Sequence, residues 1–318
     1  MNSLRILNIE PEGYAAAARD LVNTIGTLDE KKLDRAGLLK EIEGYDVLIT
    51  RLGHHIDTDV LAASSRLKAV VSATTGLDHI DLVAAAARHV EVLSLKGEKE
   101  FLEGVTATAE LAWGLLMAVM RRIPAAHQSM CRGKWNRDAF KGHELKDKRL
   151  GIVGLGRLGR MMAGFGDAFG METAAHDPDA KDWSAHVARM PDLDSLLETS
   201  DVLSLHVPLT AETENLINGD RLARLPGGAV LINTSRGAVV DEAALLKALE
   251  GGRLAGAGLD VLAGEVSPGI AESPLLGYAR GHDNLVLTPH IGGATWESMA
   301  AAELFMAEKL VRFMESNQ

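Results

Sequence analysis

Residues 150–159 read Leu150-Gly151-Ile152-Val153-Gly154-Leu155-Gly156-Arg157-Leu158-Gly159, an apolar run that continues into three glycines with the spacing G-x-G-x-x-G. The run predicts a buried strand, and residues 160–169 predict a helix. Between a strand and a helix, such glycines permit a tight turn, let a pyrophosphate approach the backbone and let the helix pack closely. Amides at the helix N-terminus then meet the negative charge. The stretch therefore predicts a dinucleotide-binding turn that includes Arg157 and Leu158.

An acidic residue follows at the distance that this turn requires. Asp177 lies 23 residues after Gly154 and ends the next predicted strand. A carboxylate there accepts hydrogen bonds from the adenosine ribose hydroxyls and repels a 2′-phosphate, which predicts NAD rather than NADP. The alternative interpretation is a glycine-rich turn followed by an Asp that caps the loop before Pro178.

Short runs of Val, Ile and Leu alternate with Ala-rich amphipathic segments along the whole chain, a pattern typical of parallel sheets flanked by helices. We expect two series of strands. The first series comprises Leu4 to Ile9, Asp46 to Thr50, Leu67 to Ala73 and Val90 to Leu95. The second comprises Arg149 to Gly154, Glu172 to Asp177, Val202 to Val207, Ala229 to Thr234, Ala255 to Val261 and Leu285 to Thr288.

Two longer apolar segments predict helices that connect the two series. Val105 to Ile123 predicts a helix that is ended by Pro124 and crosses from one lobe to the other. Thr295 to Phe313 predicts a helix with one buried face that returns to the first lobe. We expect an α/β fold of two doubly wound, Rossmann-like parallel-sheet lobes with the active site in the cleft between them. Residues 1–102 and 293–318 would form a flavodoxin-like substrate domain, and residues 103–292 the NAD-binding domain.

Composition narrows the classes of function. The chain has 318 residues, more than one core usually supports, and its net charge of −11 argues against nucleic acid or an anionic membrane as the main partner. Its single cysteine, Cys131, fits a reducing compartment. The first ten residues lack a signal-peptide pattern, and the longest apolar run, Leu111 to Met120, is too short to span a bilayer, so we expect a cytoplasmic protein. No metal is expected, because ligands at metal-binding spacing are missing from the sequence.

Three residues with catalytic potential follow later strands. Arg236 follows Ala229 to Thr234, Glu265 follows Ala255 to Val261, and His290 follows the last predicted strand. The carboxyl ends of parallel strands meet at one edge of a sheet, where such sheets bind ligands, so the three side chains are expected to converge. Taken singly, each has an ordinary structural alternative: a surface charge, a solvated loop residue or a structural hydrogen bonder.

At these residues the sequence resembles the D-isomer-specific 2-hydroxyacid dehydrogenase family, and the resemblance covers nearly the whole chain. It rests on several motifs besides the glycine turn. These are Gly133-Lys134-Trp135, Gly142-His143-Glu144-Leu145, Leu205-His206-Val207-Pro208-Leu209-Thr210 with Thr213, Asn233-Thr234-Ser235-Arg236-Gly237 and Thr288-Pro289-His290-Ile291-Gly292.

The resemblance implies a catalytic role for each of the three residues. Arg236 would bind the carboxylate and carbonyl oxygen of the substrate, which suits the fixed fork of a guanidinium. His290 would donate a proton during reduction and accept one during oxidation, since hydride transfer to a ketone builds negative charge on its oxygen. Glu265 would orient His290 and favour its protonated form.

The same resemblance implies further binding residues. It places Val207, Pro208, Thr213, Thr234, Asp260 and Gly292 along NAD, and it places Thr75, Gly76 and Leu77 in a loop whose amides face the substrate. For Asp260 a purely structural role at the strand end is the alternative. Arg51, which follows a strand of the first lobe, could bind a second anionic group of the substrate or could be a surface Arg.

The resemblance implies an NAD-dependent enzyme that transfers a hydride between nicotinamide and C2 of a small D-2-hydroxy or 2-oxo acid. Formate- or phosphite-type chemistry on the same scaffold and an NAD-binding corepressor are the alternatives. A homodimer through the region from the crossing helix to about Leu145 is also expected. Two departures stand out: Lys96 to Phe101 forms a longer, charged loop, and Ser72 to Gly76 is shorter than in typical phosphoglycerate dehydrogenases.

Overall fold

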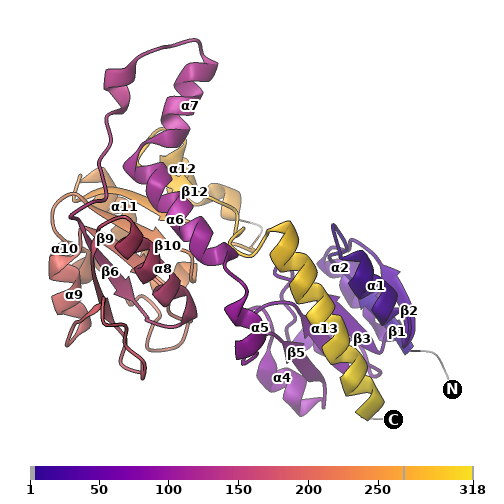
Figure 1. The fold of residues 1–318 in the computed structure, drawn as a ribbon. Coiled ribbons are helices and arrows are strands. Elements are labelled where there is room, and N and C mark those ends of the chain that lie inside the picture. The colour runs from indigo at the N-terminus through magenta and orange to yellow at the C-terminus, as the bar shows by residue number, and fades with distance from the viewer. Residues whose placement is uncertain (1–3, 268, 317–318) are drawn as a thin grey trace. The chain divides into compact units, whose positions relative to one another are not determined.

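The computed structural model describes residues 4–267 and 269–316 of the chain. It divides into two compact units, one made of Met1–Val105 with Ala294–Gln318 and the other of Thr106–Gly293. The expected bounds were 1–102 with 293–318, and 103–292. The N- and C-terminal parts of the chain belong to the same unit, which is coloured indigo to magenta and yellow in Figure 1.

The first unit is a parallel sheet with helices on both faces. Its strand order, β2-β1-β3-β4-β5, is that of a doubly wound sheet. One face packs Ile6, Ile49 and Val71 against α1, α5 and α13, and the other face packs Leu7 and Leu48 against α2, α3 and α4. The strands are β1 (Leu4–Asn8), β2 (Gly26–Glu30), β3 (Val47–Thr50), β4 (Ala69–Ser72) and β5 (Glu91–Ser94), and the helices are α1 (Ala16–Val22), α2 (Arg35–Glu41), η1 (Ile42–Gly44), α3 (Thr58–Ala62), α4 (Leu82–Ala87), α5 (Lys99–Glu103) and α13 (Trp296–Ser316).

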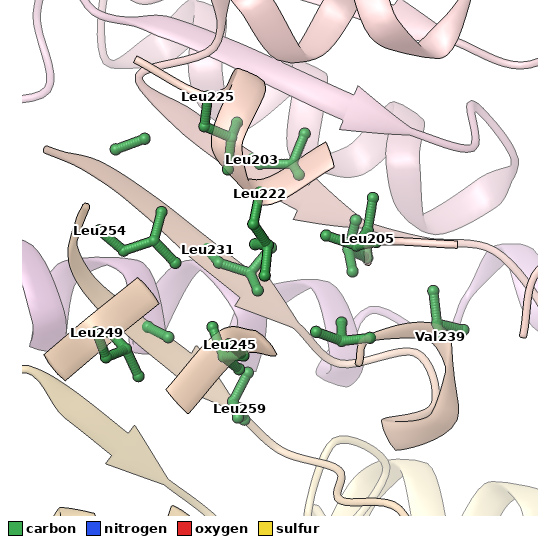
Figure 2. Packing of buried hydrophobic residues seen from close by; sticks show 14 of the residues in the cluster. Leu203, Leu205, Leu222, Leu225, Leu231, Val239, Leu245, Leu249, Leu254 and Leu259 are labelled. Atoms are coloured by element: carbon green, nitrogen blue, oxygen red, sulfur yellow. The ribbon is translucent and has the colours of Figure 1, made fainter. Parts of the chain in front are cut away.

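The second unit is a larger sheet of the same kind. Its strand order is β12-β11-β10-β9-β6-β7-β8. All strands are parallel, and after β8 the chain returns to the other side of β6 to add β9. Such sheets bind dinucleotides at the point where the order of strand addition switches sides. Leucines of β9, β10 and β11 interlock with those of α10 and α11 on one face, as Figure 2 shows. The strands are β6 (Arg149–Val153), β7 (Glu172–His176), β8 (Ala188–Arg189), β9 (Val202–Leu205), β10 (Ala229–Asn233), β11 (Leu254–Leu259) and β12 (Leu285–Leu287).

The helices of the second unit cover both faces of its sheet. Across both units, six helices in the described part of the chain begin after an Asp or Asn whose side chain accepts a backbone N–H, which satisfies an otherwise unpaired donor. The helices of this unit are α6 (Ala107–Met120), α7 (Ile123–Cys131), η2 (Arg137–Phe140), α8 (Arg157–Ala168), α9 (Leu193–Thr199), α10 (Gly219–Arg224), η3 (Gly237–Val239), α11 (Glu242–Glu250), η4 (Ile270–Glu272) and α12 (Pro274–Ala279).

The predicted crossing helix differs from the observed one. Helix α6 lies wholly in the second unit, where it packs on β10, β11 and α8, so its expected role as the crossing element is wrong. Pro124 does not end the helical region either, because it occupies the first turn of α7, where its missing N–H costs nothing. Residues Lys99–Met120 are long enough and apolar enough to cross a membrane. Residues 104–106, however, separate α5 from α6, and seven residues of α6 are buried in the core.

Candidate active site

The glycine turn between β6 and α8 has the geometry that phosphate binding requires. Gly154 has a φ of +89°, and a Cβ there would lie 2.6 Å from the His206 carbonyl oxygen. A Cβ on Gly159 would lie 2.1 Å from the Gly154 carbonyl oxygen. At Gly156, by contrast, a Cβ would meet no described atom within 4 Å. Two glycines are therefore required by packing, whereas the middle one leaves the open approach that a pyrophosphate would use.

Asp177 lies directly after β7 and supports this turn. One carboxylate oxygen accepts the Leu155 amide at 2.7 Å, and the other accepts the amides of Asp179 and Ala180 at 2.9 and 3.1 Å. The two interpretations of Asp177 are thus compatible, since it caps the following loop and also faces the turn. Its carboxylate stands where a ribose with a 2′-phosphate would be repelled.

The other predicted cofactor residues line the same edge of the sheet. Thr213 closes the loop after β9, with its hydroxyl donating to the Pro208 carbonyl oxygen at 2.6 Å. Thr234 follows β10 and is 7% exposed, and its hydroxyl finds no hydrogen-bond partner among the described residues. A buried hydroxyl without a partner is costly unless a ligand satisfies it. The residues present therefore fit a bound dinucleotide.

His206 lies beneath the glycine turn and is not an acid/base candidate. Its Nε2 pairs with the Ser204 hydroxyl at 2.8 Å, and its backbone carbonyl packs against Gly154. Burial lowers the pKa of His206 to about 4, so the imidazole is neutral at physiological pH.

Arg236 is carried by a turn that Asn233 holds rigidly. The Asn233 side chain accepts the Ser235 amide at 2.9 Å and donates to the Arg236 carbonyl oxygen at 2.9 Å. The Arg236 guanidinium is half-buried and donates to the Ser235 carbonyl oxygen at 2.7 Å. A Cβ on Gly237 would lie 2.0 Å from the Leu262 carbonyl carbon, so this turn packs directly on the segment that carries Glu265.

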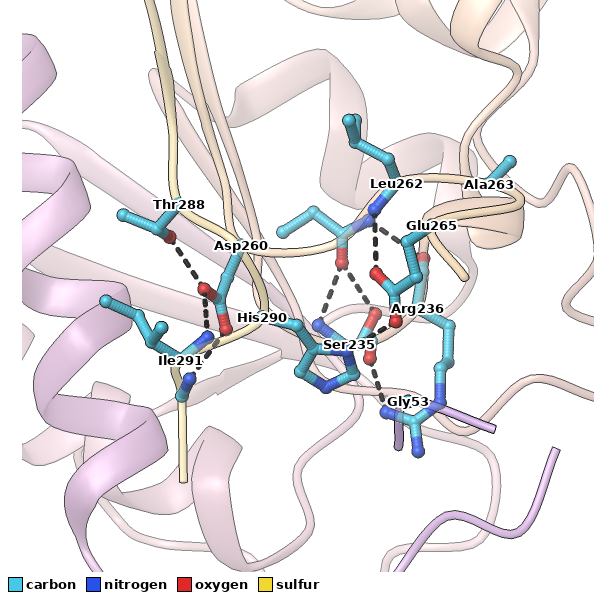
Figure 3. Close-up of polar contacts among 12 residues, drawn as sticks. Gly53, Ser235, Arg236, Asp260, Leu262, Ala263, Glu265, Thr288, His290 and Ile291 are labelled. Carbon is cyan, nitrogen blue, oxygen red and sulfur yellow. Dashed lines mark hydrogen bonds and ion pairs between the residues drawn. The ribbon is translucent and has the colours of Figure 1, made fainter. Parts of the chain in front are cut away.

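Glu265 and His290 form a hydrogen-bonded pair. The Glu265 Oε1 atom contacts His290 Nδ1, while the two side chains stay 28% and 22% exposed. Because Nδ1 is engaged, Nε2 is the nitrogen that remains to exchange a proton with a ligand. Figure 3 draws this pair together with Arg236, and all three residues belong to one unit. The expected convergence of the three residues is therefore consistent with this geometry.

His290 is held in an unusual backbone conformation by Asp260. The φ of His290 is +53°, a region that costs a non-glycine residue energy. Asp260 is 1% exposed, and its carboxylate accepts the Thr288 hydroxyl at 2.6 Å and the amides of Ile291 and Gly292 at 2.8 Å each. Burial raises the pKa of Asp260, and these hydrogen bonds oppose the rise. These contacts support the structural alternative for Asp260, and they leave its role toward NAD a prediction.

The predicted substrate loop lies in the other unit, after β4. The Thr74 hydroxyl donates to the Gly76 carbonyl oxygen at 2.8 Å and pairs with the buried Ser72 hydroxyl at 2.9 Å. The bond to the Gly76 carbonyl oxygen fixes the peptide between Gly76 and Leu77. Because this peptide is trans, the Leu77 N–H points away from the Thr74 side chain. The Thr74 side chain therefore fixes one peptide of this loop, and the substrate-binding role of Thr75, Gly76 and Leu77 stays a prediction.

Arg51 already has an anionic partner. Its guanidinium lies 3.1 Å from the carboxylate of Glu303 on α13, which is 3% exposed, and donates to the Glu12 carbonyl oxygen at 2.9 Å. Glu10 accepts the Arg51 amide at 2.5 Å. Sequence reasoning missed Glu10, Glu303 and Thr74. It quoted Asn233 within a motif but assigned it no role, since its partners become visible only once the strands are placed. Arg51 is therefore neither a free surface charge nor an unpaired anion receptor.

The charged loop that begins at Lys96 is anchored rather than purely solvated. It continues into α5, where Phe101 stacks on Phe305 of α13 with ring centroids 4.5 Å apart. The Lys309 ammonium binds the Glu98 carboxylate at 2.5 Å and the Ser94 carbonyl oxygen at 2.9 Å. The loop is therefore fixed to α13, and Phe101 packs against the core of the first unit.

Comparison with known proteins identifies the family. The model of the "D-isomer specific 2-hydroxyacid dehydrogenase, NAD binding domain" matches residues 113–292. A hydroxypyruvate reductase of Thermotoga maritima is 38% identical over 282 residues, which cover 88% of each chain. A D-3-phosphoglycerate dehydrogenase of Archaeoglobus fulgidus is 35% identical over 97% of this chain and 57% of its own. This chain spans about half the length of most of the phosphoglycerate dehydrogenases that it matches.

Solved structures agree with this result. A D-lactate dehydrogenase of Aquifex aeolicus, complexed with NAD and lactic acid, matches with a TM-score of 0.83 and 26% identity over 98% of this chain and 96% of its own. The glycine turn, Asp177 and the unpaired Thr234 hydroxyl fit the cofactor seen in that complex. This chain belongs to the D-isomer specific 2-hydroxyacid dehydrogenase family and is an NAD-dependent oxidoreductase.

Proposed function

We propose that this chain interconverts a small, unphosphorylated 2-oxo acid and the corresponding D-2-hydroxy acid. The observation that carries the proposal is the Glu265–His290 pair, which lies in the unit of the glycine turn and adjoins the Arg236 turn. A cation for a carboxylate and a proton donor for a carbonyl oxygen are the two groups that this reaction requires.

Each of the three residues has one task in the reaction. Arg236 binds the substrate carboxylate and orients the C2 carbonyl. His290 donates its Nε2 proton to the carbonyl oxygen as that oxygen gains negative charge, and it accepts the proton in the reverse reaction. Glu265 stabilises the protonated imidazole through Nδ1. When bound, NADH supplies the hydride that C2 receives, and NAD accepts it in the reverse reaction.

The surroundings of Arg51 favour an unphosphorylated substrate. Glu303 already neutralises this guanidinium, and burial raises the pKa of the Glu303 carboxyl. A phosphate at Arg51 would have to displace a buried partner, which costs more than binding to a free cation. The similarity to a hydroxypyruvate reductase points in the same direction.

A substrate panel tests the proposal. We expect NADH oxidation with hydroxypyruvate, glyoxylate or pyruvate and little with phosphohydroxypyruvate. In the opposite direction, we expect little reduction of NAD with formate or phosphite. An Arg51→Met variant should change the KM for the preferred acid less than threefold, whereas an essential Arg–carboxylate contact would raise it far more. Turnover of formate or phosphite alone would favour the rival chemistry, and NADH binding without any turnover would favour a corepressor-like role.

We also propose that the protein acts as a cytoplasmic homodimer. Helix α7 and the segment that follows it extend from the sheet of their unit (Figure 1) and leave large apolar side chains in solvent. Ile123, Met130 and Trp135 are 51%, 49% and 86% exposed. Apolar surface of this kind is typical of a subunit interface. Light scattering should give twice the mass of 33.9 kDa, and a single-chain mass would contradict the proposal.

A further inference from the structure

We propose that Glu303 on α13 is a specificity-determining residue, because it occupies the Arg51 guanidinium and so excludes a second anionic group of the acid from this edge of the first unit. The excluded class comprises 2-oxo acids that carry a phosphate or a second carboxylate. This inference rests on the proposed function and names the residue that limits its substrate class. Glu303 acts through Arg51 and is not a catalytic residue.

Arg51 follows a strand end that adjoins the predicted substrate loop. Strands β3 and β4 are parallel neighbours, with Thr50 in register with Ser72. Arg51 comes directly after β3, and the loop of residues 75–77 comes shortly after β4. Neighbouring parallel strands end at the same edge of a sheet. Arg51 is therefore placed to meet an anionic group of an acid that this loop binds.

Glu303 holds the Arg51 guanidinium through a buried carboxylate. Arg51 Nη2 lies 3.1 Å from Glu303 Oε1 and also donates to the Glu12 carbonyl oxygen at 2.9 Å. Glu303 Oε1 is buried without a hydrogen-bond partner among the described residues, so a nearby positive charge is needed to offset its burial. Burial raises the pKa of the Glu303 carboxyl, and the Ala15 amide and the Arg51 charge oppose the rise. A substrate anion that took Arg51 would leave this carboxylate buried without its partner.

Glu303 is itself fixed in place. Its other oxygen, Oε2, accepts the Ala15 amide at 2.7 Å just before α1, and α13 packs along α1 (Figure 1). The second cation whose charge acts on Glu303 is Arg19, which is bound by both carboxylate oxygens of Glu30 at 2.8 and 2.9 Å. Glu303 is thus held where Arg51 meets it, and Arg19 already serves another carboxylate.

A second carboxylate makes the surroundings of Arg51 more acidic. Glu10 accepts the Thr50 hydroxyl at 2.9 Å and the amides of Arg51 and Gly53 at 2.5 and 3.0 Å. These bonds fix the backbone that carries Arg51, and they leave the Glu10 charge beside it. With Glu303, two carboxylates adjoin one guanidinium. A phosphate or second carboxylate of a substrate would be repelled there, since like charges at close range disfavour binding.

Substitution separates the charge of Glu303 from its structural bond. Glu303→Gln keeps an oxygen that can accept the Ala15 amide but removes the charge that holds Arg51. Glu303→Met fills a similar volume with an apolar side chain and serves as the second variant if Glu303→Gln does not fold. Glu308→Gln, at an exposed position of the same helix, is the matched control for the loss of one charge.

The assay uses two matched pairs of 2-oxo acids. Phosphohydroxypyruvate differs from hydroxypyruvate by a phosphate, and oxaloacetate differs from pyruvate by a carboxylate. For Glu303→Gln, we expect kcat/KM for the acid with the extra anionic group, relative to its partner, to rise roughly tenfold or more as Arg51 gains a charged hydrogen bond to that group. Glu303→Met should show the same rise, and Glu308→Gln should leave both ratios within about twofold of the parent.

A double variant tests whether the effect passes through Arg51. Glu303→Gln combined with Arg51→Met should return both ratios to the parent values, because the released guanidinium is then missing. A gain that persists in the double variant would overturn the role of Arg51. Unchanged ratios in a folded Glu303→Gln or Glu303→Met variant, or an equal loss with both acids of a pair, would overturn the role of Glu303.

A second readout needs no turnover, so it remains informative if the proposed function fails. Phenylglyoxal modifies guanidinium groups, and mass spectrometry can follow its attachment to Arg51. Arg51 should react faster in Glu303→Gln than in the parent or in Glu308→Gln, and inorganic phosphate should slow the reaction in Glu303→Gln alone. Equal rates with equal effects of phosphate would overturn the inference, whereas absent turnover of every 2-oxo acid by the parent would overturn only the proposed function.

Discussion

Replacing Asp177 with Ala should change both cofactor preference and stability, because its carboxylate serves two purposes. The variant loses the hydrogen bond to the Leu155 amide, whose residue is 1% exposed, and two bonds to amides of a more exposed turn. An unsatisfied buried amide costs about 1–3 kcal/mol, and each exposed bond contributes roughly 0.5 kcal/mol. The sum, about 2–4 kcal/mol, corresponds to a fall in Tm of roughly 5–15 °C for a unit of this size.

The assay combines thermal unfolding with steady-state kinetics for NADH and NADPH. The preference for NADH over NADPH should fall by about tenfold or more. The variant loses one interaction with the ribose and one repulsion of the 2′-phosphate. Asp179→Ala is the matched control, since this neighbouring side chain is exposed. A variant that loses its NADH preference but has the same Tm as the parent would refute the claim that Asp177 stabilises the glycine turn. A less stable variant that still rejects NADPH would refute the contact with ribose.

Two further predictions concern residues that position the predicted ligands. Thr74→Val keeps the shape of the side chain but removes the hydroxyl bound to the Gly76 carbonyl oxygen, so the KM for the 2-oxo acid should rise about fivefold with kcat within twofold. An unchanged KM would argue against a substrate role for this loop. Asp260→Asn places a donor against amide donors near His290, and kcat should fall about 100-fold. Folding raises the pKa of the Asp260 carboxyl, so the free energy of unfolding of the parent falls as pH rises above the ordinary value of 3.8. Urea unfolding of the variant, measured from acidic to neutral pH, should lack this fall.

The interior of both sheets could be predicted from sequence, whereas the edges could not. Strands such as β3 and β9 are buried along their whole length and are mostly apolar, so their runs stand out. The edge strand β2 is partly exposed and has no apolar run, since its sequence is Gly-Thr-Leu-Asp-Glu. The other edge strand, β8, has only two residues. Neither strand was predicted. Edge strands need fewer apolar residues because one side of them lies in water.

The candidate site shows the same division. Arg236, Glu265 and His290 could be located because each follows a strand, and the ends of parallel strands share an edge. Their supporting residues could not be located in this way. Glu303 meets Arg51 from the far end of the sequence, and Glu242 meets Ala263 through the packing of a helix end on a loop. Such contacts depend on the three-dimensional placement of elements and leave no local pattern.

The central claim, that His290 exchanges the proton during hydride transfer, is tested most directly by one comparison. NADH oxidation by the parent with its preferred 2-oxo acid is measured beside His290→Gln, and the NADH dissociation constant of both is measured by fluorescence. The account predicts that kcat falls by roughly 10²–10⁴-fold while the dissociation constant stays within twofold. A variant that retains most of the parent's kcat would contradict the assignment of His290 and, with it, the proposed mechanism.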